Sequence, residues 1–235
     1  MSAFPPSWYG SEKIAFLLYP GFTALDVVGP HYMLASLMGA KVWLVAKSPG
    51  PVESDLKLAI HATASFEDCP ADLDIICVPG GTNGTLEAMR DAETVKFLED
   101  RGSRAKYVTS VCTGSMLLGA AGLLEGFKAT SHWVTREVLR DFGAEPVDAR
   151  VVIDRNRITG AGVTAGIDFG LEIVARQRDE TYAKAMQLLA EYAPEPPYTA
   201  GTPAGAGPEI AGMMSGMLTK VVGQFREVAR SRGKH

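Results

Sequence analysis

The chain has 235 residues, of which 46% are hydrophobic and 21% charged, with a formal net charge of −4 and a pI near 5.6. This composition is typical of a globular protein with a sizeable core, and its acidic balance argues against nucleic acid as the main partner. No apolar run reaches the roughly 18 residues of a membrane span. Residues 1–11 lack the basic flank and apolar centre of an export signal. The three cysteines and four scattered histidines show no metal-type spacing, so we expect a cytoplasmic protein without a metal or cofactor.

A continuous apolar run at residues 13–19 predicts the first strand, buried on both faces as in parallel sheets. Pro30 suits the first turn of a helix that is expected to run to Met38 and to stop at Gly39. A second strand is expected at residues 41–47. This strand–helix–strand order predicts an α/β fold with a doubly wound, mainly parallel sheet and helices on both faces.

The third main strand is expected at residues 73–78, after a side excursion that holds a small strand at residues 56–60. It ends in Pro79-Gly80-Gly81, at the sheet edge where open α/β folds bind ligands. The two glycines could bring backbone N–H groups close to a reacting atom, and a plain turn is the alternative. Cys77 lies within this strand and is interpreted as core packing, whereas Cys69 is interpreted as a loop thiol.

Cys112 ends an apolar, β-branched run at residues 107–111, and a helical stretch of small residues follows at once. A strand that turns sharply into a helix pushes the residue at the corner out of the end of the sheet. The N-terminal end of the helix favours an anion, so we expect Cys112 to be a thiolate nucleophile near neutral pH. The alternative is a buried structural cysteine.

The rest of the chain continues the alternation of strands and helices. We expect an amphipathic helix at residues 91–104, a hairpin at residues 150–159, and helices at residues 169–176 and 181–192. Five prolines and three glycines at residues 194–208 predict a linker or surface arm. Apolar residues from Ile210 to Val228 then repeat at helical spacing, and this wide stripe must be covered by the chain itself or by a second subunit. We expect a catalytic domain at residues 12–193, an arm with a helix at residues 194–235, and a homodimer.

Five strings occur together and in this order: Tyr19-Pro-Gly-Phe-Thr-Ala-Leu-Asp26-Val-Val-Gly-Pro30, Val78-Pro-Gly-Gly81, Val111-Cys112-Thr113-Gly114, Ala129-Thr-Ser-His-Trp133 and Gly162-Val-Thr-Ala-Gly-Ile-Asp168. With this combination the chain resembles the ThiJ/PfpI superfamily, also called the DJ-1 superfamily, over about residues 13–192. The resemblance implies the class I glutamine amidotransferase-like fold, which is flavodoxin-like and carries its cysteine at a nucleophile elbow.

Within the superfamily the motifs are most similar to the branch that hydrates isonitriles, which are lyases of the EC 4.2.1 type. The PfpI-type proteases have a histidine directly after the nucleophile, where this chain has Thr113. The parkinsonism-associated and glyoxalase-like branch usually has a glutamate where this chain has Asp26. AraC-type regulators have similar strings but continue into a DNA-binding domain, and the one helix expected after residue 194 is too little for a helix-turn-helix.

The resemblance implies that water is added to a small neutral isonitrile, R–N≡C, to give an N-substituted formamide. Cys112 would attack the isonitrile carbon and form a covalent thioimidate, with Asp26 as the acid or base. Thr113 and the Gly81 N–H would position water or stabilise developing charge. With Phe22 and Leu25 nearby, an apolar pocket is expected. Substrate contacts are expected from these residues: Gly80, Gly81, His132, Trp133 and Val163.

Two other functions stay open on the sequence. A glyoxalase-like enzyme for 2-oxoaldehydes would use Cys112, Asp26 and possible help from His132. A non-catalytic protein would use Cys112 as an oxidation sensor, because an exposed thiol of low pKa oxidises readily to sulfinic acid. For single residues, His132 as a packed or capping side chain and Asp26 as a helix N-terminal charge are the structural alternatives.

Overall fold

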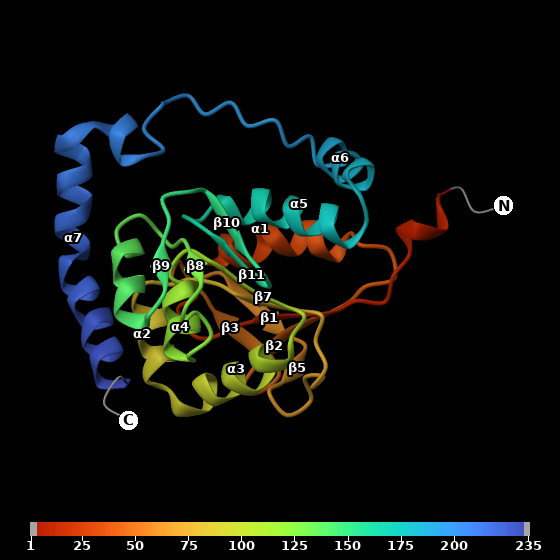
Figure 1. Ribbon diagram of the computed structural model, residues 1–235, viewed down its shortest axis with the longest axis horizontal. Helices are drawn as coiled ribbons and strands as arrows, with labels where there is room; N and C mark the ends of the chain where they lie inside the picture. The colour runs from red at the N-terminus through yellow and green to blue at the C-terminus, as the bar shows by residue number, and fades with distance from the viewer. Residues whose placement is uncertain (1–3, 233–235) are drawn as a thin grey trace.

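A seven-stranded sheet forms the centre of the molecule in the computed structural model, which describes residues 4–232 (Figure 1). All neighbouring strands are parallel except β10 and β11, which form the predicted hairpin at one edge. The chain steps from β1 to β2 on one side and to β6 on the other, so the sheet is doubly wound as predicted. In spatial order the strands are β10 (Val151–Asp154), β11 (Arg157–Gly160), β7 (Tyr107–Val111), β6 (Ile75–Val78), β1 (Lys13–Leu17), β2 (Lys41–Ala46) and β5 (Ala64–Ser65).

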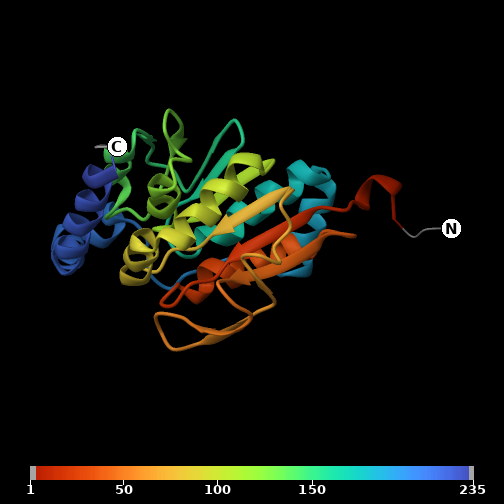
Figure 2. The same cartoon turned by 90° about the horizontal axis from the view of Figure 1, so that it is seen from below.

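Helices cover both faces of the sheet (Figures 1 and 2). One face carries α1 (Ala24–Ala35), α5 (Ala165–Gln177) and α6 (Glu180–Leu189), and the other carries α2 (Asn83–Arg90), α3 (Ala92–Arg104) and α4 (Gly114–Ala120). Two small strand pairs lie outside the main sheet: β3 (Gly50–Glu53) with β4 (Ala59–Ala62), and β8 (Lys128–Ala129) with β9 (Glu145–Pro146). Figure 2 shows the β3–β4 hairpin projecting from the body of the molecule.

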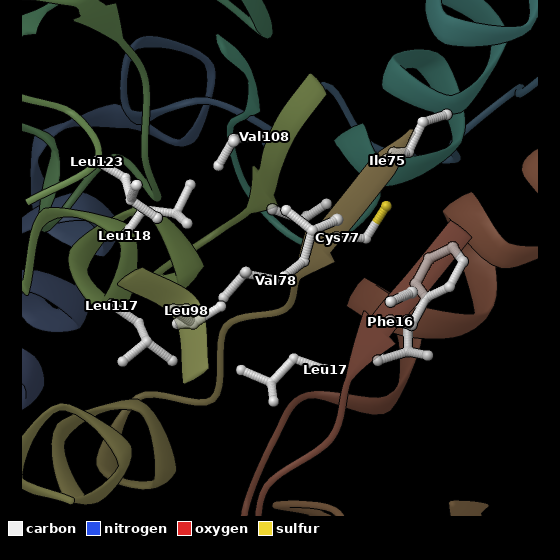
Figure 3. Close-up of a cluster of buried hydrophobic side chains, with 14 of the residues drawn as sticks. Phe16, Leu17, Ile75, Cys77, Val78, Leu98, Val108, Leu117, Leu118 and Leu123 are labelled. Carbon is white, nitrogen blue, oxygen red and sulfur yellow. The ribbon is translucent and has the colours of Figure 1, made fainter. Parts of the chain in front are cut away.

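The core consists of the apolar side chains of the central strands and of the helices that cover them (Figure 3). Cys77 lies among these side chains on β6, and the Thr109 hydroxyl donates a hydrogen bond of 3.1 Å to its sulfur. Burial raises the pKa of the Cys77 thiol to about 12, so this cysteine is a core residue, as predicted. Cys69, which was expected to be a loop thiol, lies after β5 and is also buried.

Some element boundaries differ from the prediction, for identifiable reasons. The helix expected to begin at Pro30 begins at Ala24, and Pro30 lies inside α1. Gly166 on α5 has no side chain, and a Cβ there would lie 2.9 Å from the Pro30 ring, so close packing between the two helices accommodates the proline. Residues 83–90, for which no element was predicted, form α2. The small strand expected at residues 56–60 is β4, which begins at Ala59 after a turn in which Lys57 has a φ of 70°.

The segment after α6 crosses the molecule as an irregular arm and leads into α7 (Pro203–Arg232), which lies along the opposite side (Figure 1). A non-helical Gly207, with a φ of 80°, divides α7 just before Pro208. The second part of α7 packs against α2, α4 and the short helix η2 (Arg136–Phe142). The stretch directly after Pro208, before the buried Val221, exposes four large apolar side chains: Ile210, Met213, Met214 and Met217. Residues 233–235 of the predicted arm-and-helix segment lie outside the described residues.

None of the helices within residues 4–232 has the length and apolar character required to cross a membrane.

The segment before β1 packs against the start of α6, although the sequence suggested only an irregular leader. This segment contains the short helix η1 (Pro6–Trp8) and, after it, Glu12. Glu12 forms an ion pair with Arg178, and their side chains are 10% and 2% exposed. Arg178 also donates a hydrogen bond of 2.8 Å to the Trp8 carbonyl, and the Trp8 ring meets Tyr182 edge-on with centroids 4.9 Å apart.

Candidate active site

Cys112 occupies a sharp corner between β7 and α4, as the sequence predicted. Its φ is 57°, a left-handed conformation that costs free energy for any residue with a side chain. The Cys112 N–H donates to the Gly160 and Ala161 carbonyls, at 3.1 and 2.7 Å. Its carbonyl accepts hydrogen bonds of 3.1 and 3.0 Å from the buried hydroxyls of Ser115 and Ser131. Both sides of the strained corner are therefore fixed by hydrogen bonds.

The carboxyl ends of β1, β6 and β7 bring Asp26, Gly80 and Cys112 together where the sheet reverses its strand order. The Gly80 N–H donates a hydrogen bond of 2.8 Å to Asp26 Oδ2. A Cβ on residue 80 would lie 2.7 Å from the Thr113 nitrogen and 2.8 Å from the same carboxylate oxygen, so only glycine fits here. The Asp26 Oδ1 atom is buried and has no hydrogen-bond partner among the described residues.

Burial controls the protonation of this pair. It raises the pKa of Asp26 to about 7, the Gly80 N–H opposes the rise, and the negative charge of Asp55 adds to it. Burial, followed by the Asp26 carboxylate, also raises the pKa of the Cys112 thiol well above its usual range, although the N–H and the side-chain hydroxyl of Thr113 oppose this. The expected thiolate near neutral pH is therefore wrong for the resting protein, because the start of α4 does not offset burial and a neighbouring carboxylate. Cys112 and Asp26 lie close enough for each to shift the pKa of the other.

A chain of buried hydroxyl groups fixes the orientation of Thr113. The Tyr19 hydroxyl donates to the Pro79 carbonyl at 2.6 Å, so it accepts in its 2.9 Å contact with Thr85 Oγ1. Thr85 thereby uses its only proton and must accept in its 2.9 Å contact with Thr113 Oγ1. The Thr113 proton therefore points toward Thr85.

Backbone N–H groups complete the hydrogen bonding of Thr113. Those of Gly81 and Thr82 donate to Thr113 Oγ1 at 3.1 and 3.3 Å. The expectation that Gly81 N–H stabilises charge on the substrate is corrected by this contact, because that N–H already binds Thr113. Thr82 has a φ of 46°, a second strained residue next to Cys112. The Thr113 side chain thus holds the 80–82 loop in place, with its hydroxyl between Thr85 and the Cys112 thiol.

A cavity of about 530 Å³ opens onto Cys112 and Thr113. Of the expected substrate contacts, His132 and Val163 line it, and burial lowers the pKa of His132. Within the described part of the chain, Gly80, Gly81 and Trp133 are not on its wall. The apolar pocket expected from Leu25 is present, whereas Phe22 is fully buried in the core. The remaining lining residues are Thr23, Ala24, Ser54, Asp55, Leu56, Leu58, Thr82, Thr135, Leu218 and Val221.

Two parts of this wall were not foreseen from the sequence. One is the β3–β4 turn, where Leu56 and Leu58 are 86% and 55% exposed. The other is α7, which contributes Leu218 and Val221. The apolar stripe of α7 indicated that this helix packs against another surface. The position of α7 beside Cys112 depends on tertiary packing that no local sequence pattern encodes.

A second cavity, of about 580 Å³, lies beyond Tyr19 between the β2–β3 connection and α2, and Cys112 does not line it. Each charged side chain of its lining is paired: Lys47 with Asp91 at 2.7 Å, Glu53 with Lys57 at 2.6 Å, and Glu87 with Arg90 at 3.0 Å. The lining of this cavity has no cysteine or histidine among the described residues, so the cavity at Cys112 is the candidate site. Across residues 4–232, no three His, Cys, Asp or Glu side chains are arranged to hold a metal ion.

The sequence profile of the DJ-1/PfpI family matches residues 12–176. The chain belongs to the DJ-1/PfpI family. An isonitrile hydratase of Pseudomonas putida, 49% identical over 191 residues, matches 81% of this chain and 83% of that protein. The HTH-type transcriptional regulator GbdR of Pseudomonas aeruginosa is 30% identical over 196 residues, which cover 80% of this chain but 53% of the regulator.

The crystal structure of a ThiJ/PfpI family protein from Pseudomonas syringae superposes with a TM-score of 0.94 at 55% identity and covers 97% of both chains. That similarity therefore extends well past residue 176. Drosophila melanogaster DJ-1β, at 20% identity and a TM-score of 0.68, is covered completely by 79% of this chain and shows the common fold alone.

Proposed function

We propose that this protein is an isonitrile hydratase, which adds water to R–N≡C and releases the N-substituted formamide. The observation that carries the proposal is the buried pair of Cys112 and Asp26 beside a largely apolar cavity. The 49% identity to the Pseudomonas putida isonitrile hydratase supports it. A neutral substrate suits this site, because the wall is largely apolar and an anionic substrate would lose its hydration and meet the carboxylate of Asp55.

In the first step the Cys112 sulfur attacks the terminal carbon of the isonitrile. The thiol proton passes to Asp26, whose Oδ1 lacks a partner and whose pKa of about 7 allows it to accept and release a proton near neutrality. Asp26 then delivers this proton to the same carbon. The thiol has thereby added across that carbon, and the product is the neutral thioimidate R–N=CH–S–Cys112.

In the second step water attacks the thioimidate carbon, and a water proton passes to the nitrogen, with Asp26 again carrying it. The resulting R–NH–CH(OH)–S adduct collapses as the C–S bond breaks and the hydroxyl proton returns to sulfur through Asp26. The products are R–NH–CHO and the free thiol, so the added atoms sum to one water. The Thr113 N–H, which faces the sulfur, would stabilise negative charge there as the bond breaks.

The raised pKa of Cys112 disfavours the oxidation-sensor alternative. Sensor thiols are exposed and ionise readily, whereas the Cys112 residue is 6% exposed and burial favours its protonated form. A thiol whose proton leaves only during attack suits a catalyst with its own base. The glyoxalase-like alternative uses the same residues, so the two functions are distinguished by which substrate the protein turns over.

The test is turnover of para-nitrophenyl isocyanide to its formamide by the reduced protein, with Cys112→Ala, Asp26→Asn and, as a matched cysteine control, Cys69→Ala. We expect turnover by wild type and Cys69→Ala, none by Cys112→Ala, and a loss of about 10²–10⁴-fold in Asp26→Asn. Mass spectrometry of the quenched reaction should find one isonitrile added to Cys112. Activity that survives Cys112→Ala would overturn the covalent mechanism, and an inert wild type that forms lactate from methylglyoxal would favour the glyoxalase-like function.

The homodimer expected from the sequence stays a prediction. The exposed methionines of α7 are consistent with a covered surface, and sedimentation velocity would measure the mass in solution.

A further inference from the structure

The wall of the Cys112 cavity includes two apolar residues from α7, Leu218 and Val221. All other lining residues lie between Thr23 and Val163, inside the span matched by the family profile. The C-terminal helix is therefore the only part of the described chain outside that span that reaches the site. It supplies side chains without reactive groups, so its contribution must be to shape and polarity.

The second part of α7 is held firmly against the domain. Val221, Phe225 and Ala229 recur every fourth residue, and all three are buried. Arg226 lies 3.3 Å from Asp141 of η2. Leu218 is one turn before Val221 and is half-buried, whereas its neighbour Met217 is 71% exposed. Leu218 thus lies where the stripe of α7 passes from the core to the rim of the cavity.

Apolar side chains from the domain line the same cavity. Leu25, on α1, is 41% exposed, and Leu56 and Leu58 in the β3–β4 turn are more so. Hydrogen bonds hold this turn in place, since Asp55 N–H donates to the Phe22 carbonyl at 2.9 Å. Exposed leucines around a cavity mouth mark a surface that an apolar ligand group covers on binding.

We infer that Leu218 and Val221 are specificity-determining residues, which contact the R group of the substrate and limit its size. The inference rests on the proposed function for the identity of the reacting group. The isonitrile carbon lies at Cys112, and R lies in the apolar cavity bounded by α1, the β3–β4 turn and α7. The preferred substrates are isonitriles with a bulky alkyl or aryl R group. A carboxylate on R is rejected, because Asp55 lines the same cavity.

The test compares wild type with Leu218→Trp, which fills the cavity, and Leu218→Ala, which enlarges it. Met217→Trp is the matched control, because it adds the same side chain at the exposed neighbouring position. We expect Leu218→Trp to lower kcat/KM for naphthyl isonitrile by about 10- to 100-fold relative to methyl isonitrile, the range over which apolar pockets discriminate by size. Leu218→Ala should shift the ratio the other way, and Met217→Trp should not change it.

A second measurement separates this inference from the proposed function. The rate at which iodoacetamide alkylates Cys112 is compared with that of a naphthyl iodoacetamide, with the modified residue identified by peptide mass spectrometry. The size preference should shift in Leu218→Trp and Leu218→Ala in the directions found for isonitriles. If the protein does not turn over isonitriles but the Leu218 variants still change its alkylation preference, the role of α7 in limiting the size of the ligand is supported and the proposed hydratase function is rejected. Unchanged preferences in both Leu218 variants, in both assays, would overturn the inference, and a poorly folded Leu218→Trp leaves Leu218→Ala to decide it.

Discussion

Replacing Asp26 by asparagine should stabilise the folded protein, and increasingly so as the pH rises. Asp26 is 2% exposed, and burial raises its pKa from 3.8 to about 7. The folded state therefore binds this proton more tightly than the unfolded chain does. The stability that protonated Asp26 contributes is complete below pH 3.8 and is lost as the pH rises through about 7.

The size of the effect follows from the two pKa values. Each tenfold difference in proton affinity is worth about 1.4 kcal/mol, so ionised Asp26 costs the folded state about 4 kcal/mol at full ionisation. About 2 kcal/mol of this is present at about pH 5, where Asp26 is ionised only in the unfolded chain, and nearly all of it at about pH 8. Asparagine keeps an oxygen for the Gly80 N–H and has no charge to bury.

Urea denaturation of wild type and Asp26→Asn at several pH values measures the effect. We expect the difference in the free energy of unfolding to grow in favour of the variant by about 2–3 kcal/mol between about pH 5 and about pH 8. Glu67→Gln removes an exposed carboxylate after β5 and serves as the control, with little change expected across this range. A difference between wild type and Asp26→Asn that stays constant with pH would refute the reasoning that burial raises the pKa of Asp26.

Three other substitutions test the supports of the site and of the N-terminal segment. Thr85→Val leaves the buried Thr113 proton without an acceptor, so it should cost about 1–3 kcal/mol in urea and lower kcat more than it raises KM; an unchanged kcat would contradict the assigned proton order. Gly80→Ala places a Cβ against Thr113 and should destabilise by about 1–3 kcal/mol and abolish turnover in the formamide assay. Arg178→Ala leaves Glu12 buried without its partner and should lower the unfolding free energy by about 3–5 kcal/mol; an effect no larger than that of Lys13→Ala, which breaks an exposed pair, would show that this ion pair is not what anchors the segment.

The features that could be predicted from the sequence are those encoded in neighbouring residues. The apolar run before Cys112 and the small residues after it specify a strand, a corner and a helix within a few positions. The alternation of such units determines the doubly wound sheet, and right-handed connections leave little choice of topology. The position of Asp26 beside Cys112 follows as well, because parallel strands place their carboxyl ends at one edge.

The features that were missed depend on contacts between distant segments. The expected thiolate at Cys112 rested on the start of the helix that follows it, and the sequence could not give the protonation state of Asp26; burial by the whole domain, followed by the carboxylate of Asp26, raises the pKa of the thiol. Gly81 was assigned to the substrate because an N–H near a reacting atom can bind charge, but Thr113 accepts from it first. The start of α1 was misplaced because Pro30 is accommodated by a glycine on α5. Leu218 lines the site only because the arm returns α7 to this side of the domain.

Several unfavourable features of this fold lie at the residues of the proposed mechanism. Cys112 and Thr82 have positive φ values, and Asp26 is a buried carboxyl group with one oxygen unpartnered. Each lowers the stability of the folded state, and each is held by hydrogen bonds from residues outside the cavity, so that the strain cannot relax. The same burial that costs stability raises the pKa of Asp26 to about 7 and favours the protonated form of the Cys112 thiol. In the proposed mechanism such a site suits electrophiles that accept both the sulfur and its proton, as the isonitrile carbon does.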